Sequence, residues 1–278
     1  MLAIDRKFAP HASLRQYFMT SETDQPGTIA TPDGATIAYR HLPAKASGGG
    51  PGLLFCCGFH SDMGGNKATR LHDFAVRTGR QYTRFDYQGH GASSGAFREG
   101  TIGTWFSDAL AVLDRVTDGP QIVVGSSMGG WMAMLLARAR PDKVAGLLLI
   151  APAPDFPQKL MLPSMPEEVR AVLYRDGVWD RPSEYADEDY PITLKLIEES
   201  QAHHLLDGDL LPFDGPVRII HGAADESVPL DHVLRIPAAI RSADVVTEIV
   251  KGGDHRLSTE ADLRRMEARV EDLICLTA

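Results

Sequence analysis

The stretch that most constrains the fold is residues 125–129, the pentapeptide GSSMG, which fits the pattern G-x-S-x-G. It follows the apolar run 121–124, typical of a buried strand, and precedes the helix-forming residues 131–136. In this context the pattern predicts a nucleophile elbow, a sharp strand-to-helix turn that exposes its serine at the carboxyl end of a sheet. We therefore identify Ser127 as the candidate nucleophile. An ordinary glycine-rich turn is the alternative, because the bare pentapeptide is common by chance.

A serine nucleophile needs an acid and a histidine base, which follow it in that order in this kind of fold. Residues 217–220 indicate a late strand that leads into a loop holding Asp225, and residues 245–250 indicate a last strand followed by His255. We expect Asp225 to orient His255, and His255 to deprotonate Ser127.

Other residues compete for these roles. An aspartate after a strand is often a turn or N-cap residue, and a loop histidine is often only solvated. Asp254 and Glu226 are the rival acids, although Asp254 is too near His255 in sequence to reach the far ring nitrogen. The rival bases are weaker on strand position or chain order, and they are His90, His203, His204 and His221.

The loop after the third expected strand supplies candidates for substrate contact. Gly58 follows this strand and lets the backbone turn toward the elbow, so we expect the N–H groups of Phe59 and Met128 to form an oxyanion hole. The pattern departs from the common His-Gly pair, since Cys57 stands at the histidine position. His60 and Met63 are candidate substrate-binding residues, although His60 is equally well explained as a plain hydrogen-bonding residue.

The order of elements predicts an α/β fold with a mostly parallel, doubly wound sheet, formed by one domain over residues 1–278. The expected strands are residues 28–31, 36–42, 52–57, 82–87, 120–125, 144–150, 217–221 and 245–250. The expected helices are residues 66–78, 102–117, 128–139, 230–241 and 258–276.

Residues 155–213 interrupt this alternation. They lack strand patterning, contain short helical stretches at 166–174 and 192–206, and lie where such folds insert a helical cap over the active site. The segment has 13 acidic and 5 basic side chains, so it holds most of the chain's net charge of −9. A solvated acidic face is the main interpretation and a substrate-selecting field the alternative. Nucleic acid is not expected as a partner, because a polyanion would be repelled.

The amino terminus, the apolar runs and the cysteines of the sequence favour a cytoplasmic protein. The amino terminus lacks the apolar region and cleavage site of a signal peptide, and no apolar run approaches the roughly 18 residues of a membrane span. The three cysteines are interpreted as small core residues in a reducing compartment. We expect no metal ion and no organic cofactor.

Five segments carry a resemblance to a known family, and they are residues 84–91, 119–131, 177–185, 202–206 and 254–256. They resemble the mitochondrial abhydrolase-domain enzymes that act as protein depalmitoylases and acyl-glucuronide esterases. The resemblance runs from about residue 30 to 275 and includes part of the expected cap. It implies the α/β-hydrolase fold, Ser127, Asp225 and His255 as a catalytic triad, and hydrolysis of esters or thioesters. No Arg- and Ser-rich transit peptide is present, which favours a bacterial cytoplasmic relative.

We predict a serine hydrolase that cleaves a small-molecule acyl ester or thioester through an acyl-serine intermediate. An acyltransferase using the same triad and a non-catalytic small-ligand receptor of the same fold are the alternatives. An ordered base argues against the receptor, which has no need of one. Haloalkane or epoxide chemistry would require an aspartate where Ser127 stands. Acyl-chain length, leaving group and oligomeric state are left open.

Overall fold

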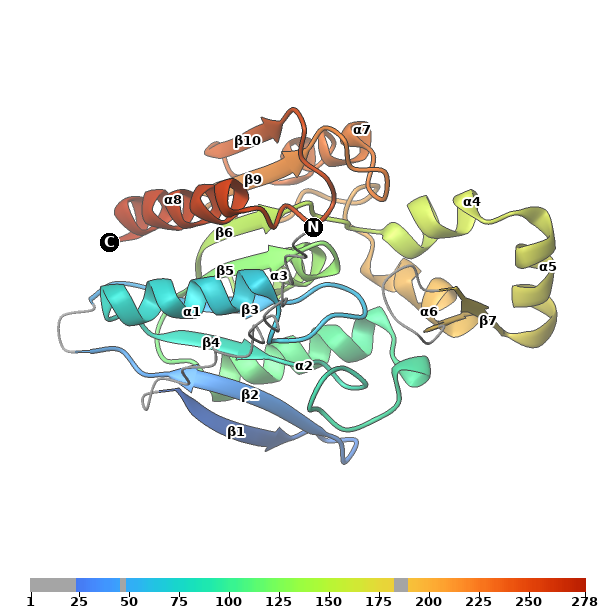
Figure 1. Ribbon diagram of the computed structural model, residues 1–278, viewed down its shortest axis with the longest axis horizontal. Helices are drawn as coiled ribbons and strands as arrows, with labels where there is room; N and C mark the ends of the chain where they lie inside the picture. Colours follow the sequence, from blue (N-terminus) through green and yellow to red (C-terminus); the bar gives the residue numbers. More distant parts are fainter. Residues whose placement is uncertain (1–23, 46–48, 183–189) are drawn as a thin grey trace, which may run out of the picture.

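The computed structural model describes residues 24–45, 49–182 and 190–278. The amino-terminal segment used to predict the location, and residues 183–189 of the expected cap, lie outside this part. An eight-stranded sheet forms the centre of the body, with the strand order β1-β2-β4-β3-β5-β6-β9-β10 (Figure 1). The strands are β1 (Gln25–Ala30), β2 (Thr36–Leu42), β3 (Gly52–Cys56), β4 (Tyr82–Phe85), β5 (Gln121–Ser126), β6 (Val144–Ile150), β9 (Val217–Gly222) and β10 (Val245–Val250).

The pairing of the strands confirms the predicted mostly parallel sheet. β2 runs antiparallel to β1 and β4, and every other neighbouring pair is parallel. The chain leaves β3 toward β4 on one side and reaches β5 on the other, so the order of the strands reverses at β3. In open α/β sheets the crevice at such a switch point, beyond the carboxyl ends of the strands, is where ligands bind. The loops after β3 and β5 are those that carry Phe59 and Ser127.

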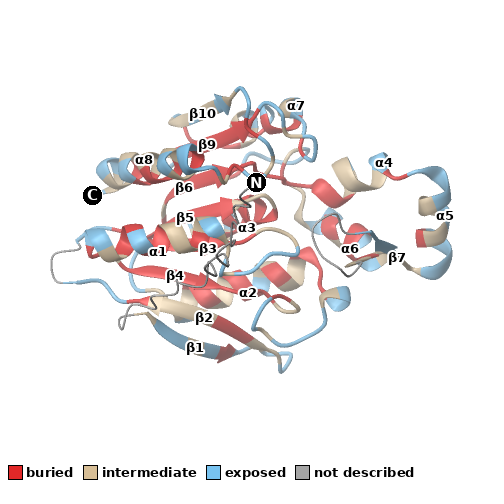
Figure 2. Ribbon diagram, in the orientation of Figure 1, coloured by how far each residue is buried: buried red, intermediate tan, exposed pale blue. Residues whose placement is uncertain are grey.

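Helices cover both faces of the sheet. They are α1 (Asn66–Thr78), α2 (Ile102–Arg115), α3 (Met128–Ala139), α7 (Leu230–Val233) and α8 (Glu260–Thr277). α1 contacts α8 on one face and α2 contacts α3 on the other, so β3 and β5 are buried between them (Figures 1 and 2). α7 is much shorter than the helix expected over 230–241. Pro237 begins a separate 3₁₀ turn there, because proline has no N–H to continue the helical bonds.

The segment between β6 and β9 projects from one end of the sheet (Figure 1). It contains a π-helical turn (Pro157–Met161), α4 (Leu162–Ser164), α5 (Glu167–Asp176), β7 (Val178–Arg181), β8 (Tyr190–Thr193), α6 (Leu194–Glu199) and a 3₁₀ turn (Ser200–His203). The expectation that it lacks strands is wrong, because β7 and β8 pair antiparallel. These strands have four residues each, too few for a clear alternation of apolar and polar positions.

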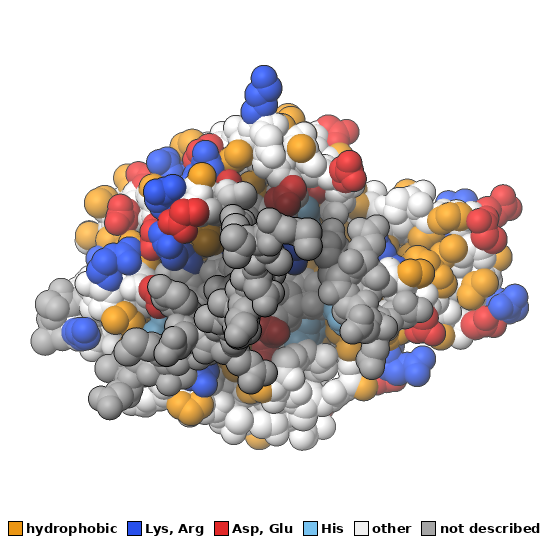
Figure 3. Space-filling view, viewed as in Figure 1, with side chains coloured by type: hydrophobic (Ala, Val, Ile, Leu, Met, Phe, Trp, Pro, Cys, Tyr) orange, Lys and Arg blue, Asp and Glu red, His pale blue; other side chains and the backbone are white. Residues whose placement is uncertain are grey.

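Hydrogen bonds join the two ends of the projecting segment to each other and attach the segment to the body. The buried Asp155 carboxylate accepts the N–H groups of Leu205 and Leu206, each at 2.9 Å, and so joins the start of the segment to its end. The indole Nε1 of Trp131 donates to the His203 carbonyl at 3.1 Å. Apolar side chains gather on this segment, with charged ones around them (Figure 3). Its attachment therefore depends on a few polar contacts as well as on packing.

Gly129 allows α3 to pack closely against β3. A Cβ at this position would lie 2.0 Å from the Cys56 carbonyl oxygen, and a strand backbone in the core has no room to shift. We expect Gly129→Ala to lower the free energy of unfolding by about 3 kcal/mol. Gly208→Ala is the matched control, since nothing lies within 4 Å of its added Cβ. Urea titration measures both variants, and a Gly129→Ala midpoint equal to that of the control would contradict this close packing.

Candidate active site

Ser127 stands at the turn between β5 and α3 in a backbone conformation that few non-glycine residues adopt, with φ 56° and ψ −119°. Its N–H donates to the Ile150 carbonyl at 2.9 Å, and its own carbonyl accepts from Gly130 and Ala153. Gly125 is required beside it, because a Cβ there would lie 2.1 Å from the Gly129 carbonyl oxygen. These contacts hold the serine at the carboxyl edge of the sheet.

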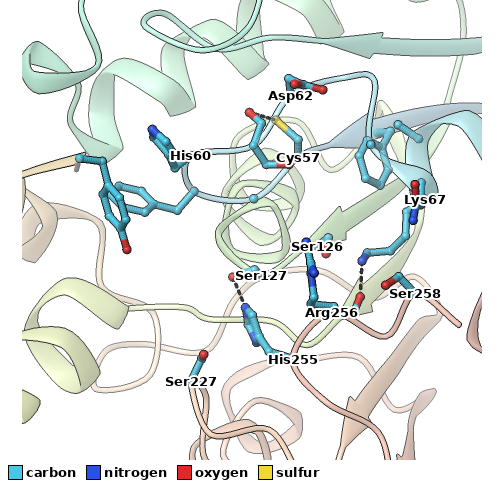
Figure 4. A pocket seen from close by; sticks show the side chains of 18 residues that line it. Cys57, His60, Asp62, Lys67, Ser126, Ser127, Ser227, His255, Arg256 and Ser258 are labelled. Atoms are coloured by element: carbon cyan, nitrogen blue, oxygen red, sulfur yellow. Dashed lines mark hydrogen bonds between the residues drawn. The ribbon is translucent and has the colours of Figure 1, made fainter. Parts of the chain in front are cut away.

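The side chains of Ser127, His255 and Asp225 form a continuous hydrogen-bonded chain. Ser127 Oγ lies 3.0 Å from His255 Nε2, and the two side chains face each other across the site (Figure 4). His255 Nδ1 lies 2.7 Å from Asp225 Oδ2. A carboxylate only accepts, so Nδ1 carries the proton and Nε2 is left with a lone pair for the serine hydroxyl. This tautomer is the one that a general base for Ser127 needs.

Asp225 is held as a buried carboxylate. Burial by itself would raise the pKa of Asp225, but the hydrogen bonds from His255 and from the backbone N–H groups of Val228 and Ser227 outweigh burial and lower it. The carboxylate can therefore keep its charge beside an imidazolium.

Among the described residues, none of the rival acids or bases is hydrogen-bonded to Ser127 Oγ. Asp254 accepts the N–H of Leu257 at 2.9 Å, which makes it a turn residue, and Glu226 is exposed. His203 Nε2 is bonded to Glu199 at 2.9 Å. His221 is buried and lies 3.8 Å from Asp225 Oδ2. Within the described residues, Ser127 Oγ has a hydrogen bond to His255 alone.

Two backbone donors lie next to the elbow. The loop after β3 packs against it, since a Cβ at Gly58 would lie 3.3 Å from the Ser126 carbonyl oxygen. In the part of the chain that the structure describes, the N–H groups of Phe59 and Met128 donate to no protein acceptor. Met128 also begins α3, where the helix dipole is positive. Both donors are thus available to an oxyanion.

A cavity of about 710 Å³ opens over Ser127 and is lined by Phe59, His60, Tyr190 and His255 among others (Figure 4). The His60 ring is stacked on Tyr190 of β8, with centroids 4.8 Å apart. The structure therefore brings His60 to the cavity. Met63 is not among the described residues that line this cavity, and its backbone N–H donates to Asp86 Oδ1 at 2.7 Å.

Residues 53–269 match the alpha/beta hydrolase family. The chain belongs to this family. It is 37% identical over 247 residues to the palmitoyl-protein thioesterase ABHD10 of Bos taurus, covering 88% of this chain and 79% of that protein.

Two solved structures are similar to this alpha/beta hydrolase over most of its length. A putative hydrolase from Agrobacterium vitis is 39% identical with a TM-score of 0.84, covering 90% of this chain and 99% of that one. Alpha/beta hydrolase domain-containing protein 10 from mouse is 37% identical with a TM-score of 0.81, covering 90% and 98%. The chain is thus a hydrolase of this thioesterase and esterase type, as the resemblance implied. The expected cytoplasmic location gains no support, because the ABHD10 relatives are named as mitochondrial.

Tyr190 and Lys67 are among the residues that line the cavity of this alpha/beta hydrolase and were not predicted from the sequence. Tyr190 reaches the cavity only through the fold of the projecting segment, so no local pattern indicates it. Lys67 lies in the first turn of α1, soon after the loop that carries Phe59, and this position was a usable signal. Its ammonium donates to the Arg256 carbonyl, and burial lowers the pKa of Lys67 to about 8.

Residues 24–45, 49–182 and 190–278 contain no cluster of three or more His, Cys, Asp or Glu side chains able to hold a metal ion. Over the same ranges, none of the helices combines the length and the apolar character needed to cross a bilayer.

Proposed function

We propose that this alpha/beta hydrolase cleaves carboxylic esters or thioesters, with Ser127 as nucleophile, His255 as general base and Asp225 as the acid that orients it. The observation that carries the proposal is the hydrogen-bonded chain from Ser127 Oγ to His255 at 3.0 Å and from His255 to Asp225 at 2.7 Å. The relatives named palmitoyl-protein thioesterase support an acyl thioester as substrate.

In the acylation step, Ser127 Oγ attacks the carbonyl carbon while its proton passes to His255 Nε2. The negative oxygen of the tetrahedral intermediate accepts from the N–H groups of Phe59 and Met128, and Asp225 stabilises the imidazolium. The intermediate then collapses. The bond to the leaving sulfur or oxygen breaks, and that atom takes the proton from His255 Nε2. Acyl-Ser127 and a free thiol or alcohol result.

In the deacylation step, water takes the place of the leaving group. His255 Nε2 removes a proton from the water as its oxygen attacks the acyl carbon, and the same two N–H groups hold the oxyanion. Collapse breaks the bond to Ser127 Oγ, which regains its proton from His255. The products are a carboxylic acid and the original enzyme, so each turnover consumes one water and needs no cofactor.

The aromatic side of the cavity suits an acyl chain. Phe59, His60 and Tyr190 line it, and Tyr190 belongs to the projecting segment. We therefore propose that residues 155–213 act as a cap that covers the acyl chain. The Tyr190 ring stacks on the His60 ring with centroids 4.8 Å apart, and this contact between the segment and the loop after β3 supports the role.

A panel of p-nitrophenyl esters and acyl-CoA thioesters of graded chain length tests the proposed function. Hydrolysis that releases the carboxylic acid supports it. Transfer of the acyl group to an added alcohol or amine in preference to water would favour an acyltransferase. Well-folded protein that binds acyl compounds without turnover would favour the receptor. The cytoplasmic location is likewise a proposal, and fractionation of the producing cells tests it.

The charge of the protein should affect substrate choice. The resemblance implies that anionic acyl glucuronides are substrates, yet most of the net charge of −9 lies in residues 155–213. We expect a neutral medium-chain ester to have a higher kcat/KM than a glucuronide of the same acyl group. The difference should shrink as salt rises, since exposed charges are screened beyond roughly 8–10 Å at physiological ionic strength. A salt-independent preference for the glucuronide would show that cavity groups such as Arg256, or the cap residue Arg181, outweigh the acidic surface.

A further inference from the structure

His90, in the loop after β4, connects two loops beneath the site through its two ring nitrogens. Nδ1 lies 3.1 Å from the Gln88 carbonyl oxygen, and Nε2 accepts the backbone N–H of His60 at 3.3 Å. A carbonyl can only accept and an N–H can only donate, so Nδ1 carries the proton and Nε2 presents its lone pair. The contact with Gln88 therefore fixes the tautomer of His90, and the hydrogen bond from the His60 N–H depends on that tautomer.

The His60 peptide needs an external support. Its N–H belongs to the peptide unit that joins it to Phe59, the proposed oxyanion donor. His60 itself has a φ of 55°, a left-handed conformation that is unfavourable for a residue with a side chain. Such conformations persist only where the surroundings hold them. The bond to His90 Nε2 holds this peptide plane and, through it, the orientation of the Phe59 backbone.

His90 is itself firmly anchored. The residue is 4% exposed, and its ring packs edge-on against Phe97 and Trp105, with centroids 5.1 and 5.2 Å away. The Gln88 carbonyl that it contacts also accepts from Trp105 Nε1, and Gln88 N–H donates to Asp108 of α2 at 2.8 Å. Burial lowers the pKa of His90 to about 4, so its Nε2 stays an acceptor at neutral pH. The support for the His60 peptide thus extends back to a core helix.

We propose that His90 is a positioning residue for the oxyanion hole, which holds the Phe59 N–H in place through its hydrogen bond to the His60 N–H. The proposal rests on the proposed function, since it takes the Phe59 N–H as an oxyanion donor. It assigns no proton transfer to His90, whose ring nitrogens are both engaged away from Ser127.

Two substitutions of His90 test the roles of its two ring nitrogens separately. The amide of Gln reaches the position of Nε2 and can accept from His60, whereas the shorter amide of Asn reaches only the position of Nδ1 and can bond only Gln88. We expect His90→Asn to lower kcat by about 10- to 100-fold with little change in KM, because a donor misplaced by a fraction of an ångström serves the transition state poorly. His90→Gln should recover most of the lost kcat.

The inhibition constant of an alkyl trifluoromethyl ketone distinguishes a positioning role of His90 from a role in packing alone, which would leave this constant unchanged. The ketone forms a hemiketal with the serine whose oxyanion occupies the hole, so its inhibition constant should weaken in His90→Asn by the same factor as kcat. Thermal unfolding of both variants monitors stability. Equal losses of kcat in both variants, or unchanged ketone affinity in His90→Asn, would overturn the proposal. A wild-type protein without ester hydrolysis would instead remove the proposed function.

Discussion

Ser127→Ala is expected to reduce ester turnover by about 10⁴-fold or more and to abolish labelling by a fluorophosphonate probe. The Ser127 Oγ is the atom within 3.0 Å of His255 Nε2, so its removal leaves the base with no hydroxyl to activate. The elbow backbone keeps its hydrogen bonds to Ile150, Gly130 and Ala153 in the variant, so folding should be retained. Mass spectrometry of the labelled protein and thermal unfolding together measure the two effects.

Ser126→Ala is the matched control, since Ser126 lies in the same pentapeptide and also lines the cavity. It ends β5 and has no hydrogen bond to His255 among the described residues. Labelling of this control should match the wild type. If the probe instead modifies Ser126, or fails to react with well-folded protein, Ser127 is not the nucleophile.

The sequence predicted the parts of the site that local chemistry determines. A glycine at position 125 and another at 129 are dictated by backbone contacts of 2.1 and 2.0 Å that any Cβ would make, so the elbow leaves a clear pattern. The positions of Asp225 and His255 follow from β9 and β10, whose apolar runs are long enough to recognise. Parallel strands end at the same edge of the sheet, so the order of the elements brings these loops together.

Contacts that depend on packing between distant segments left no such pattern. The hairpin of β7 and β8 is too short for its alternation to be recognised, and Tyr190 reaches His60 only because that hairpin folds back over the body. Met63 was expected in the cavity from its place in the loop after β3. Met63 is not among the lining residues that the structure describes, and its backbone N–H donates at 2.7 Å to Asp86, which lies on another loop, beyond the reach of a local pattern.

The second large loss of turnover is expected from replacing Asp225, the acid that orients His255. Asp225→Asn is expected to lower turnover by roughly 10³- to 10⁴-fold, because an amide can donate to His255 Nδ1 and so favour the tautomer that carries its proton on Nε2. In that tautomer Nε2 cannot accept the proton of Ser127. The matched control is Asp254→Asn, since Asp254 is adjacent to the base but accepts the N–H of Leu257 at 2.9 Å. Its turnover should change far less.

Steady-state kinetics of the two variants at one pH, with one ester, decides between the acids. The site favours Asp225 on two grounds: its Oδ2 lies 2.7 Å from His255 Nδ1, and its hydrogen bonds lower its pKa despite burial. A carboxylate that stays ionised beside the base can stabilise the imidazolium in both steps of the reaction. A larger loss of turnover in Asp254→Asn than in Asp225→Asn would identify Asp254 as the acid. The loop after β10 would then have to rearrange, because Asp254 would exchange its turn contact with Leu257 for a contact with the imidazole.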